Sequence, residues 1–499
     1  MRRVLAPLAQ PVALVASWHR ARWLVPGPAW RTRDGVLIVT AARHRTDAPA
    51  FVSRRLPWHP DLLGLVANDS ARYPALLESA ATGSGSARYD VVPAFPGERL
   101  ELDVHGQLHG PHAGADGFLR ALDRWWLAQR GGTPPGALPF AGGWLLFLGY
   151  ELAALIEPRV PVPDAGSASP RALALRCPAA VIRDHHARCV WLVAEATHGA
   201  RLTDMERDLA AAQRLPAGGP ALCEDLHEDP PRAFIDGVAR ILDYIRDGDV
   251  FQVNLSRGWQ ARLLPGVSPA RLYARLRGVN PAPFAGLARL GEHWILSSSP
   301  ERLFSIRDGM VDTRPIAGTH PRAADPEQDA ALSRALIAHP KERAEHIMLI
   351  DLERNDLGRV CEGGSVEVNE LMVLESYTHV HHIVSNVRGR LRRDVTPGQV
   401  IAATFPGGTI TGCPKVRCMQ IIAQLEDVRR GPYTGSLGYL GVDGGTDLNI
   451  LIRTLGLDGD SVTLRAGAGI VADSDPQREL EETRHKARGP LQALQAGSL

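Results

Sequence analysis

The sequence predicts a mixed α+β fold in which helices and short strands alternate. Residues 51–225 alternate short apolar runs with turns rich in Gly, Pro and Ser, which is typical of strands joined by tight connections. Residues 232–249 space their apolar side chains for one face of a helix, and residues 250–257 alternate apolar with polar side chains. A chain of 499 residues is long enough to bury a large core, in one unit or in two.

Five elements are predicted in the second half of the chain. A helix over 232–249 ends at Asp247-Gly248. A strand over 250–257 turns Phe251, Val253 and Leu255 to one face and Gln252, Asn254 and Ser256 to the other. The remaining elements are a helix over 341–356, a three-stranded meander over 433–471 with turns at 443–445 and 458–459, and a helix over 476–494.

Composition divides the chain into three regions. Residues 1–50 are rich in Arg and Pro, and we expect an irregular N-terminal extension there. Residues 51–230 form the mixed region described above, and it ends in HEDPP, whose two prolines cannot continue a helix. Residues 231–495 contain the motifs that carry chemistry.

The charge balance excludes several classes of protein. The 56 Lys and Arg residues nearly equal the 55 Asp and Glu residues, whereas a nucleic-acid-binding protein usually carries a basic excess. No apolar run reaches the roughly 18 residues of a membrane span. The six cysteines form no CxxC pair, so we expect reduced thiols and a cytoplasmic location.

Lysine is rare in this chain, which contains only Lys341, Lys415 and Lys486. The other 53 basic residues (56 − 3) are arginines. Arginine is a rigid fork, whereas lysine is a compact charge whose pKa shifts readily, so lysine is expected where arginine cannot replace it. All three lysines lie in the last third of the chain, and the chemistry is expected there.

Two pairs of glutamates are candidates for a metal site. Glu342 and Glu345 are three residues apart on one predicted helix, and Glu479 and Glu482 repeat this spacing on another. Such pairs are common on solvated helices, but the apolar run 346–350 predicts that the first helix is largely buried. Buried carboxylates need a counter-charge, and two pairs together would form an oxygen-rich site suited to Mg²⁺.

Glycine-rich segments and one arginine are candidates for binding an anion. The segments 405–415 (FPGGTITGCPK) and 465–474 (RAGAGIVADS) offer backbone N–H groups, although such segments are usually only turns. Arg453 lies in the apolar run LNILIRT, which predicts a strand, and a buried arginine needs an anion. His382 is one of three clustered histidines, and on its own it is more often structural.

The last 270 residues resemble the chorismate-utilising enzymes. These are component I of anthranilate synthase and of aminodeoxychorismate synthase, and the isochorismate and salicylate synthases. The matching segments are GDVFQVNLS (248–256), SSSPERLF (297–304), RPIAGTHPR (314–322), KERAEHIMLIDLERNDLGRV (341–360), YTHVHHIVSNVRG (377–389), FPGGTITGCPKVRCMQII (405–422), IRTL (452–455) and AGAGIVADSDPQRELEETRHKA (466–487).

The resemblance implies a fold and a division of labour along the chain. The family fold is an α/β/β/α sandwich of two packed antiparallel sheets flanked by helices, with the active site between the sheets. The resemblance makes 231–495 the chorismate-binding catalytic region and 51–230 an anthranilate-synthase-I-like region. It is weaker over this second region and absent over 1–50.

The resemblance also implies roles for individual residues. Glu345 and Glu482 would bind Mg²⁺ directly, and Glu342 and Glu479 would act through water. Glu301 would be the general acid that protonates the departing C4 hydroxyl, which requires a raised pKa. The other catalytic residues would be His382, Thr409 and Lys486. The substrate contacts would be Gln252, Ala317, Gly318, Thr319, Tyr433, Arg453, Gly467 and Gly469.

Position 252 indicates the nucleophile. Family members that add water at C2 carry a lysine there as general base, and this chain carries Gln252. Ammonia needs deprotonation far less than water does, so ammonia is the expected nucleophile. The chain has no G-x-C-x-G turn of a glutaminase, and we therefore expect the ammonia to come from a separate glutamine amidotransferase subunit.

The sequence features divide between amination at C4, as in aminodeoxychorismate synthase, and amination at C2, as in anthranilate synthase. Ala317 is typical of anthranilate synthases, because many aminodeoxychorismate synthases have a lysine there that adds to C2. The segments GGTITG (407–412), DLERND (351–356) and NPAPFAG (280–286) resemble the folate branch instead. The balance favours aminodeoxychorismate synthase component I. Ala317 then implies that water or ammonia is the first nucleophile at C2.

An inactive, tryptophan-binding regulator is the alternative from another class. LLES (76–79) resembles the tryptophan-site segment of the family, so a bound tryptophan is possible. All four glutamates and the lysines at 415 and 486 are present, which argues for an active enzyme.

Overall fold

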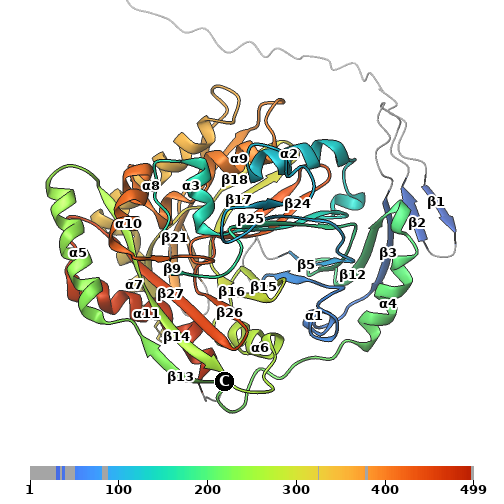
Figure 1. Cartoon of the computed structure of the whole chain (residues 1–499), viewed down its shortest axis with the longest axis horizontal. Coiled ribbons are helices and arrows are strands. Elements are labelled where there is room, and N and C mark those ends of the chain that lie inside the picture. Colours follow the sequence, from blue (N-terminus) through green and yellow to red (C-terminus); the bar gives the residue numbers. More distant parts are fainter. Residues whose placement is uncertain are drawn as a thin grey trace, which may run out of the picture.

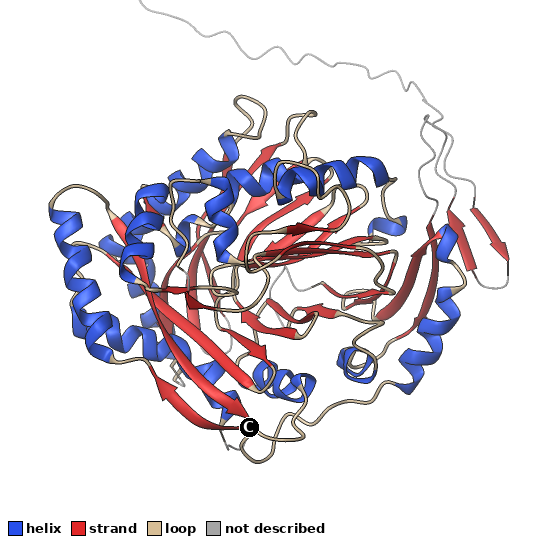
Figure 2. Ribbon diagram, in the orientation of Figure 1, coloured by secondary structure: helices blue, strands red, loops and turns tan. Residues whose placement is uncertain are grey.

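Two large sheets packed face to face form the centre of the molecule, and helices cover their outer faces (Figures 1 and 2). The computed structural model describes residues 30–33, 36–39, 51–80, 88–163, 165–323, 325–376 and 380–495. Neighbouring strands within both sheets are antiparallel. The predicted α+β sandwich is therefore confirmed.

The larger sheet has the strand order β1-β2-β3-β12-β11-β5-β4-β15-β16-β26-β27-β14-β13, and β22 pairs with β14. Its strands are β1 Trp30–Arg33, β2 Val36–Val39, β3 Phe51–Pro57, β4 Ala75–Glu78, β5 Tyr89–Ala94, β11 Ala179–Asp184, β12 Cys189–Glu195, β13 Cys223–Glu228, β14 Gln252–Leu263, β15 Phe284–Leu290, β16 His293–Ser299, β22 Gly412–Cys413, β26 Thr454–Asp458 and β27 Ser461–Ile470.

The smaller sheet has the strand order β19-β21-β18-β17-β25-β24-β8-β10-β6-β7, and β20 pairs with β21. Its strands are β6 Arg99–Leu102, β7 Leu108–His109, β8 Gly143–Leu148, β10 Ala172–Cys177, β17 Arg302–Arg307, β18 Met310–Thr313, β19 Ile316–Pro321, β20 Glu367–Ser376, β21 Val380–Arg390, β24 Ser436–Gly441 and β25 Thr446–Asn449. A short parallel pair, β9 Ala165–Gly166 and β23 Val428–Arg429, lies apart from both sheets.

The helices form two outer layers. The α-helices are α1 Leu63–Asn68, α2 Phe118–Gln129, α3 Ala153–Ile156, α4 Arg201–Ala211, α5 Pro231–Arg246, α6 Pro269–Val279, α7 Pro326–Ala338, α8 Pro340–Gly358, α9 Pro397–Thr404, α10 Lys415–Leu425 and α11 Pro476–Leu494. The 3-10 turns are η1 Pro135–Ala137, η2 Tyr150–Leu152, η3 Ala196–His198 and η4 Gly408–Ile410. Helices α1, α4, α6 and α11 pack on the larger sheet, and α2, α8 and α9 pack on the smaller one.

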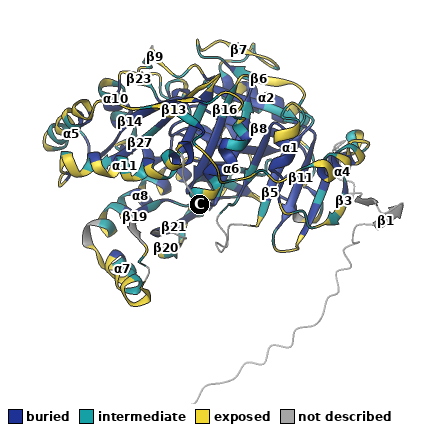
Figure 3. Ribbon diagram, turned by 90° about the horizontal axis from the view of Figure 1, so that it is seen from below, coloured by how far each residue is buried: buried dark blue, intermediate teal, exposed yellow. Residues whose placement is uncertain are grey.

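A dry core lies between the sheets. Leu145 and Phe147 of β8 and Leu437 of β24 pack against Ala288 of β15 and Ile295 of β16. All five side chains are buried, and Figure 3 shows the strands as the buried centre of the molecule. Burial of this apolar surface holds the sheets together.

Three predicted helices are confirmed within a few residues of their expected ends, as α5, α8 and α11. The predicted strand at 250–257 begins later, at Gln252, and continues to Leu263. Phe251 precedes the strand and is 68% exposed, so its predicted place beside Val253 on a buried face is wrong. Alternation alone did not reveal that the chain turns just before the strand.

The predicted meander is split between the two sheets. Residues 433–471 form four strands rather than three: β24 and β25 belong to the smaller sheet, and β26 and β27 to the larger one. The two predicted turns are present, with positive φ at Gly444 and Gly459. The chain crosses between the sheets at 450–453, so Arg453 lies in this connection and not in the predicted strand. The apolar run was a crossing through the core, which has the same composition as a buried strand.

The N-terminal extension contains some regular structure. Strands β1 and β2 lie within residues 1–50, which were predicted to be irregular, and β2 pairs with β3 at the edge of the larger sheet. The rest of that region lies outside the described residues. Both sheets combine strands from before and after residue 230, so the predicted regions remain a division of the sequence.

Two features of the composition have structural counterparts. The six cysteines form no disulfide bond. Among the described helices, none combines the length and apolar character that a membrane crossing requires.

A buried ionic network ties the end of α10 to the larger sheet. Glu426 accepts hydrogen bonds from the Ser256 amide at 2.8 Å and its hydroxyl at 2.9 Å. The same carboxylate pairs with Arg430 at 2.7 Å and with Arg465 at 3.1 Å. Both arginines and the donated hydrogen bonds lower the pKa of Glu426 against the effect of burial, so it is held as an anion.

Replacing Glu426 by alanine is expected to lower the free energy of unfolding by about 3–5 kcal/mol, because Arg430 would remain buried without its partner. Urea denaturation measures this change. The control is Asp236→Ala, which removes an exposed ion pair with Arg232 and should cost less than about 1 kcal/mol. Equal stability of the two variants would contradict the role given to Glu426.

Candidate active site

Glu301 is a buried carboxyl group between the two sheets. It follows the end of β16, and its side chain is 5% exposed. Its Oε1 accepts a long hydrogen bond of 3.4 Å from the Ile316 amide at the start of β19. Burial raises the pKa of Glu301 to about 8, and the Glu353 carboxylate adds to this rise. The group is therefore mostly protonated near neutral pH, as a general acid must be.

Thr409, in η4, lies next to Glu301 and opposes the rise of its pKa. Its Oγ1 is buried, yet it makes no hydrogen bond of good geometry among the described residues. This hydroxyl is thus available to a substrate or to the neighbouring carboxyl group.

Arg453 and His382 lie near Glu301. Arg453 has a positive φ of 53° in the connection between the sheets, and it forms no ion pair with a described residue. Burial lowers its pKa, and the nearby Glu301 opposes this effect. His382, on β21, is buried, and burial together with Arg453 lowers its pKa to about 3. A neutral imidazole thus lies near a buried guanidinium, and a buried guanidinium is stabilised by an anion.

The two glycines of β27 allow close approach of polar side chains. A Cβ atom on Gly467 would lie 2.7 Å from the Tyr433 hydroxyl and 2.8 Å from Asn254 Oδ1, and one on Gly469 would lie 2.3 Å from Gln252 Nε2. Burial raises the pKa of Tyr433 to about 12, so its hydroxyl remains a donor. Gln252 Oε1 and Asn254 Oδ1 have no hydrogen-bond partner among the described residues.

Asn254 was not predicted as a site residue. It lies two residues after Gln252 on the same strand, so the sequence already placed both side chains on one face. Their two buried, unpartnered oxygens make this face a candidate wall for a ligand.

Lys486 connects the last helix to this wall. Its Nζ donates to the Gly467 carbonyl oxygen at 3.1 Å and pairs with Glu482 at 2.7 Å. It also lowers the pKa of Glu301 from a distance. The structure therefore brings Lys486, Gly467 and Glu301 into one neighbourhood.

The segment 316–321 supplies the edge strand β19 beside β21. Ala317 is buried, and a bulge between Ala317 and Thr319 gives Gly318 a positive φ of 67°. The backbone of Thr319 lies opposite His382. A Cβ atom on Gly318 would lie 2.9 Å from Glu342 Oε2, so this glycine leaves room for the first glutamate pair.

The four glutamates remain in two pairs. Glu342 and Glu345 lie on α8, and Glu479 and Glu482 lie on α11. Their carboxylate oxygens suit Mg²⁺ by their chemistry. No three His, Cys, Asp or Glu side chains of the described residues gather into a group that could hold a metal ion. The donors therefore fit the metal in kind, but they do not converge on one point.

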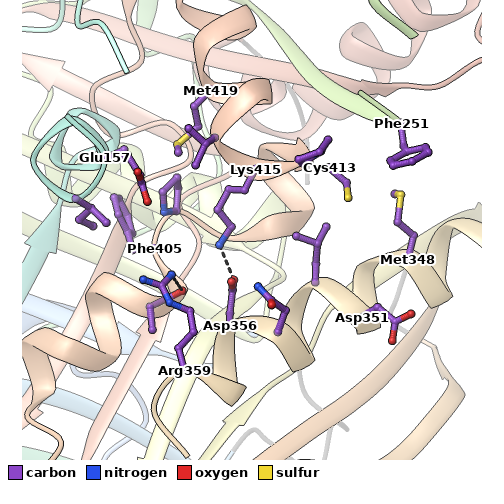
Figure 4. Close-up of a pocket in the computed structure, with 18 of the residues that line it drawn as sticks. Glu157, Phe251, Met348, Asp351, Asp356, Arg359, Phe405, Cys413, Lys415 and Met419 are labelled. Carbon is purple, nitrogen blue, oxygen red and sulfur yellow. Dashed lines mark hydrogen bonds and ion pairs between the residues drawn. The ribbon is translucent and has the colours of Figure 1, made fainter. Parts of the chain in front are cut away.

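Helix α8 is less buried than its apolar run predicts. His346 and Leu349 face the core, but Ile347 is 50% exposed. The exposed face lines a pocket of about 820 Å³ together with α9 and α10 (Figure 4). Lys415 and Asp356 form an ion pair of 2.5 Å in this pocket.

The raised pKa of Glu301 gives a prediction for stability. The ionised form is disfavoured in the folded protein, so its contribution is fully present below about pH 4.5 and is lost as the pH rises through about 8. Glu301→Gln removes this dependence. Between pH 5 and pH 9, the variant should gain roughly 3–4 kcal/mol in unfolding free energy relative to the wild type. Urea unfolding at both pH values measures the difference, and the exposed Glu327→Gln variant should show none.

The sequence and structure match one enzyme family. The family profile for chorismate binding enzymes covers residues 100–492. Aminodeoxychorismate synthase component 1 of Bacillus subtilis (strain 168) is 40% identical over 441 residues, which are 85% of this chain and 92% of that protein. Anthranilate synthase component 1 of Synechocystis sp. is 41% identical over 471 residues, with 86% and 92% covered.

Solved structures agree with this assignment. Anthranilate synthase component I from Streptococcus pneumoniae TIGR4 superposes with a TM-score of 0.71 at 32% identity, covering 82% of this chain and 93% of that one. The menaquinone-specific isochorismate synthase from Escherichia coli superposes with a TM-score of 0.69 at 20% identity, covering 90% and 96%, and shares the fold. With its acid, its arginine and its glycine wall between two sheets, the chain belongs to the chorismate-binding enzyme family.

Proposed function

We propose that this protein is an aminodeoxychorismate synthase component I. It replaces the C4 hydroxyl of chorismate by ammonia and forms 4-amino-4-deoxychorismate, a precursor of para-aminobenzoate and folate. Residue 252 supports amination most directly. Water-adding relatives are expected to have a lysine base at this position, whereas this chain has Gln252, whose buried amide packs on Gly469. An amide cannot deprotonate water, whereas ammonia attacks as the free base.

The site residues divide the work between binding and proton transfer. Arg453 and Lys486 are cations that suit the two carboxylates of chorismate. The Tyr433 hydroxyl and the backbone of Gly467 lie close together and would also contact the substrate. Glu301 gives its proton to the departing C4 hydroxyl, which leaves as water. His382 stays neutral and, with Thr409, borders the ring.

Magnesium dependence is part of the proposal. Glu345 and Glu482 would bind the ion directly, and Glu342 and Glu479 would act through water. When bound, Mg²⁺ would neutralise the ring carboxylate of chorismate. The room that Gly318 leaves for Glu342 supports an inward position of this pair.

Anthranilate synthase component I is the second candidate. Ala317 supports it, because this position carries no lysine that could add to C2, and relatives at about 40% identity are named for both activities. The segment 280–286 supports the first candidate, because its sequence resembles the folate branch. Phe284 of this segment lines a second pocket of about 690 Å³ together with Leu77 and Glu78, which belong to the segment that resembles the family's tryptophan site.

An inactive tryptophan-binding regulator would use this second pocket instead. The protonated Glu301 and the unpaired Arg453 are costly to keep buried and have no use in such a protein. We further infer that the partner is a glutamine amidotransferase subunit that supplies ammonia, in keeping with the component naming of the relatives.

Product analysis tests the proposal. Incubation with chorismate, Mg²⁺ and an ammonium salt at mildly alkaline pH should give a product that keeps the enolpyruvyl group. Fluorescent anthranilate with pyruvate would favour the second candidate. EDTA should abolish turnover, and glutamine should replace ammonium only when the amidotransferase subunit is added. Intact-mass spectrometry of the same mixture should find no stable adduct, because Ala317 offers no nucleophile.

Gly467→Ala tests the glycine wall. Its Cβ atom would lie 2.6 Å from the Leu255 carbonyl oxygen and 2.7 Å from the Tyr433 hydroxyl, and the backbone oxygen cannot move easily. The KM for chorismate should rise at least about tenfold, equivalent to ~1.4 kcal/mol. Gly97→Ala, which points into open space, is the control. An unchanged KM in Gly467→Ala would argue against this wall as the substrate contact.

A further inference from the structure

We propose that a buried histidine, His381, holds the neighbouring His382 in its place in the active site through a clasp with helix α7. This histidine clasp consists of Asp329 on α7, Ser376 at the end of β20 and His381 on β21. His381 and Asp329 are positioning residues, because they act on the substrate only through His382. The inference rests on the role of His382 under the proposed function, but not on which amination product forms.

Both ring nitrogens of His381 are bonded. Nε2 lies 3.0 Å from Asp329 Oδ1, and Nδ1 lies 2.7 Å from the Ser376 hydroxyl. The His381 side chain is only 4% exposed, so little water competes for these two contacts. A ring that is bonded at both nitrogens keeps one orientation, and here the two bonds join α7, β20 and β21.

Asp329 is fixed on its other side by the segment that leads into α7. Arg322 donates to both of its carboxylate oxygens, at 3.0 Å and 2.9 Å, and the Ala323 amide donates to Oδ1 at 3.0 Å. Arg322, the Ala323 amide and His381 together hold the pKa of Asp329 well below its usual range. The carboxylate therefore only accepts hydrogen bonds, so Nε2 of His381 carries the proton of the bond between them.

His382 is the next residue of β21 and lies in the site. Ser376 of β20 lies opposite His381 in the ladder. Thr319 of β19 lies opposite His382. Neighbouring residues of a strand point to opposite faces, so the two imidazoles have different surroundings. The clasp therefore acts on His382 through the backbone that the two histidines share.

The backbone at His382 needs this support because its other neighbour, β19, is weakly held. β19 is the outermost strand of the smaller sheet, so β21 pairs with it along one edge only. A bulge between Ala317 and Thr319 interrupts even this pairing. Gly318, inside the bulge, makes a backbone hydrogen bond with His382. A bulged edge strand is held by fewer ladder bonds than an inner strand, and it fixes His382 less firmly.

Helix α7 packs on both strands that hold His382. It lies beside β19, β20 and β21 (Figure 3). Leu336, near the end of α7, is fully buried, and its Cδ1 would lie 3.0 Å from a Cβ atom on Gly318. Asp329, near the start of α7, bonds to His381 of β21. The helix is thus attached to β19 at one end and to β21 at the other, and the clasp is the second of these attachments.

The position of His382 matters because its imidazole borders the ring of chorismate under the proposed function. A small displacement of a group beside the reacting atoms slows the chemical step. Arg453 and Lys486, which are assigned to the carboxylates of chorismate, lie on other elements. Loss of the clasp should therefore lower kcat and leave the KM for chorismate nearly unchanged.

His381→Ala tests the clasp in combination with His382→Ala. Each single variant should lower kcat about tenfold or more, and the double variant should be no slower than His382→Ala, because His381 acts only through His382. A residue that merely stabilises the fold would lower kcat independently, and the two losses would multiply. Glu327→Gln, in the exposed first turn of α7, is the control and should keep the wild-type kcat.

The other outcomes are distinct. Losses that multiply in the double variant, or an unchanged kcat in His381→Ala, overturn the clasp. A normal kcat in His382→Ala beside a slow His381→Ala also overturns it, because His381 would then act by another route. Wild-type enzyme that leaves chorismate unchanged contradicts the proposed function itself.

Urea unfolding of each variant shows whether the fold is kept. Should His381→Ala fail to fold, Asp329→Ala completes the same cycle with His382→Ala, because Asp329 lies on the outer helix and its loss leaves His381 in place. Asp329→Ala should lower kcat in the wild-type background and have no further effect in the His382→Ala background. A further loss in that background overturns the clasp.

Discussion

The burial of Glu301 between the two sheets is the constraint on which the site depends. A carboxyl group there remains protonated because the dry packing of the sheets withholds water from it. The same packing lowers the pKa of His382 and leaves Arg453 without an ion pair among the described residues. The acid, the neutral imidazole and the free guanidinium are therefore three results of one desolvated space.

The facing strands combine tight apolar packing with polar contacts. Large side chains such as Phe147 fill the core between the sheets, whereas Gly467 and Gly469 have no side chain and let Tyr433, Asn254 and Gln252 approach β27 closely. The ionic network of Glu426 fixes β14 against β27 beside the same glycines. Stability and ligand access are thus supplied by neighbouring parts of the same strands.

Several helices and site residues could be predicted from the sequence, because helix periodicity and family motifs are local features. Helices α5, α8 and α11 were predicted from the sequence, and the resemblance to the family implied that Glu301, Lys486 and the two glycines of β27 belong to one site. The split of 433–471 between two sheets was not predictable, since apolar alternation does not say which sheet a strand joins. Asn254 was not predicted as a site residue, because its missing hydrogen-bond partner can be recognised only in the three-dimensional structure.

The late strands of the chain have a consequence for its synthesis. Strand β24 covers one edge of β8, and β26 covers one edge of β16, although more than 150 residues separate each pair along the chain. While the ribosome is still making the last helices, β8 and β16 each have a flank without a partner. Such unpaired edges attract strands of other molecules. Until β24 and β26 emerge, the nascent chain therefore exposes two strand edges that can pair with other chains.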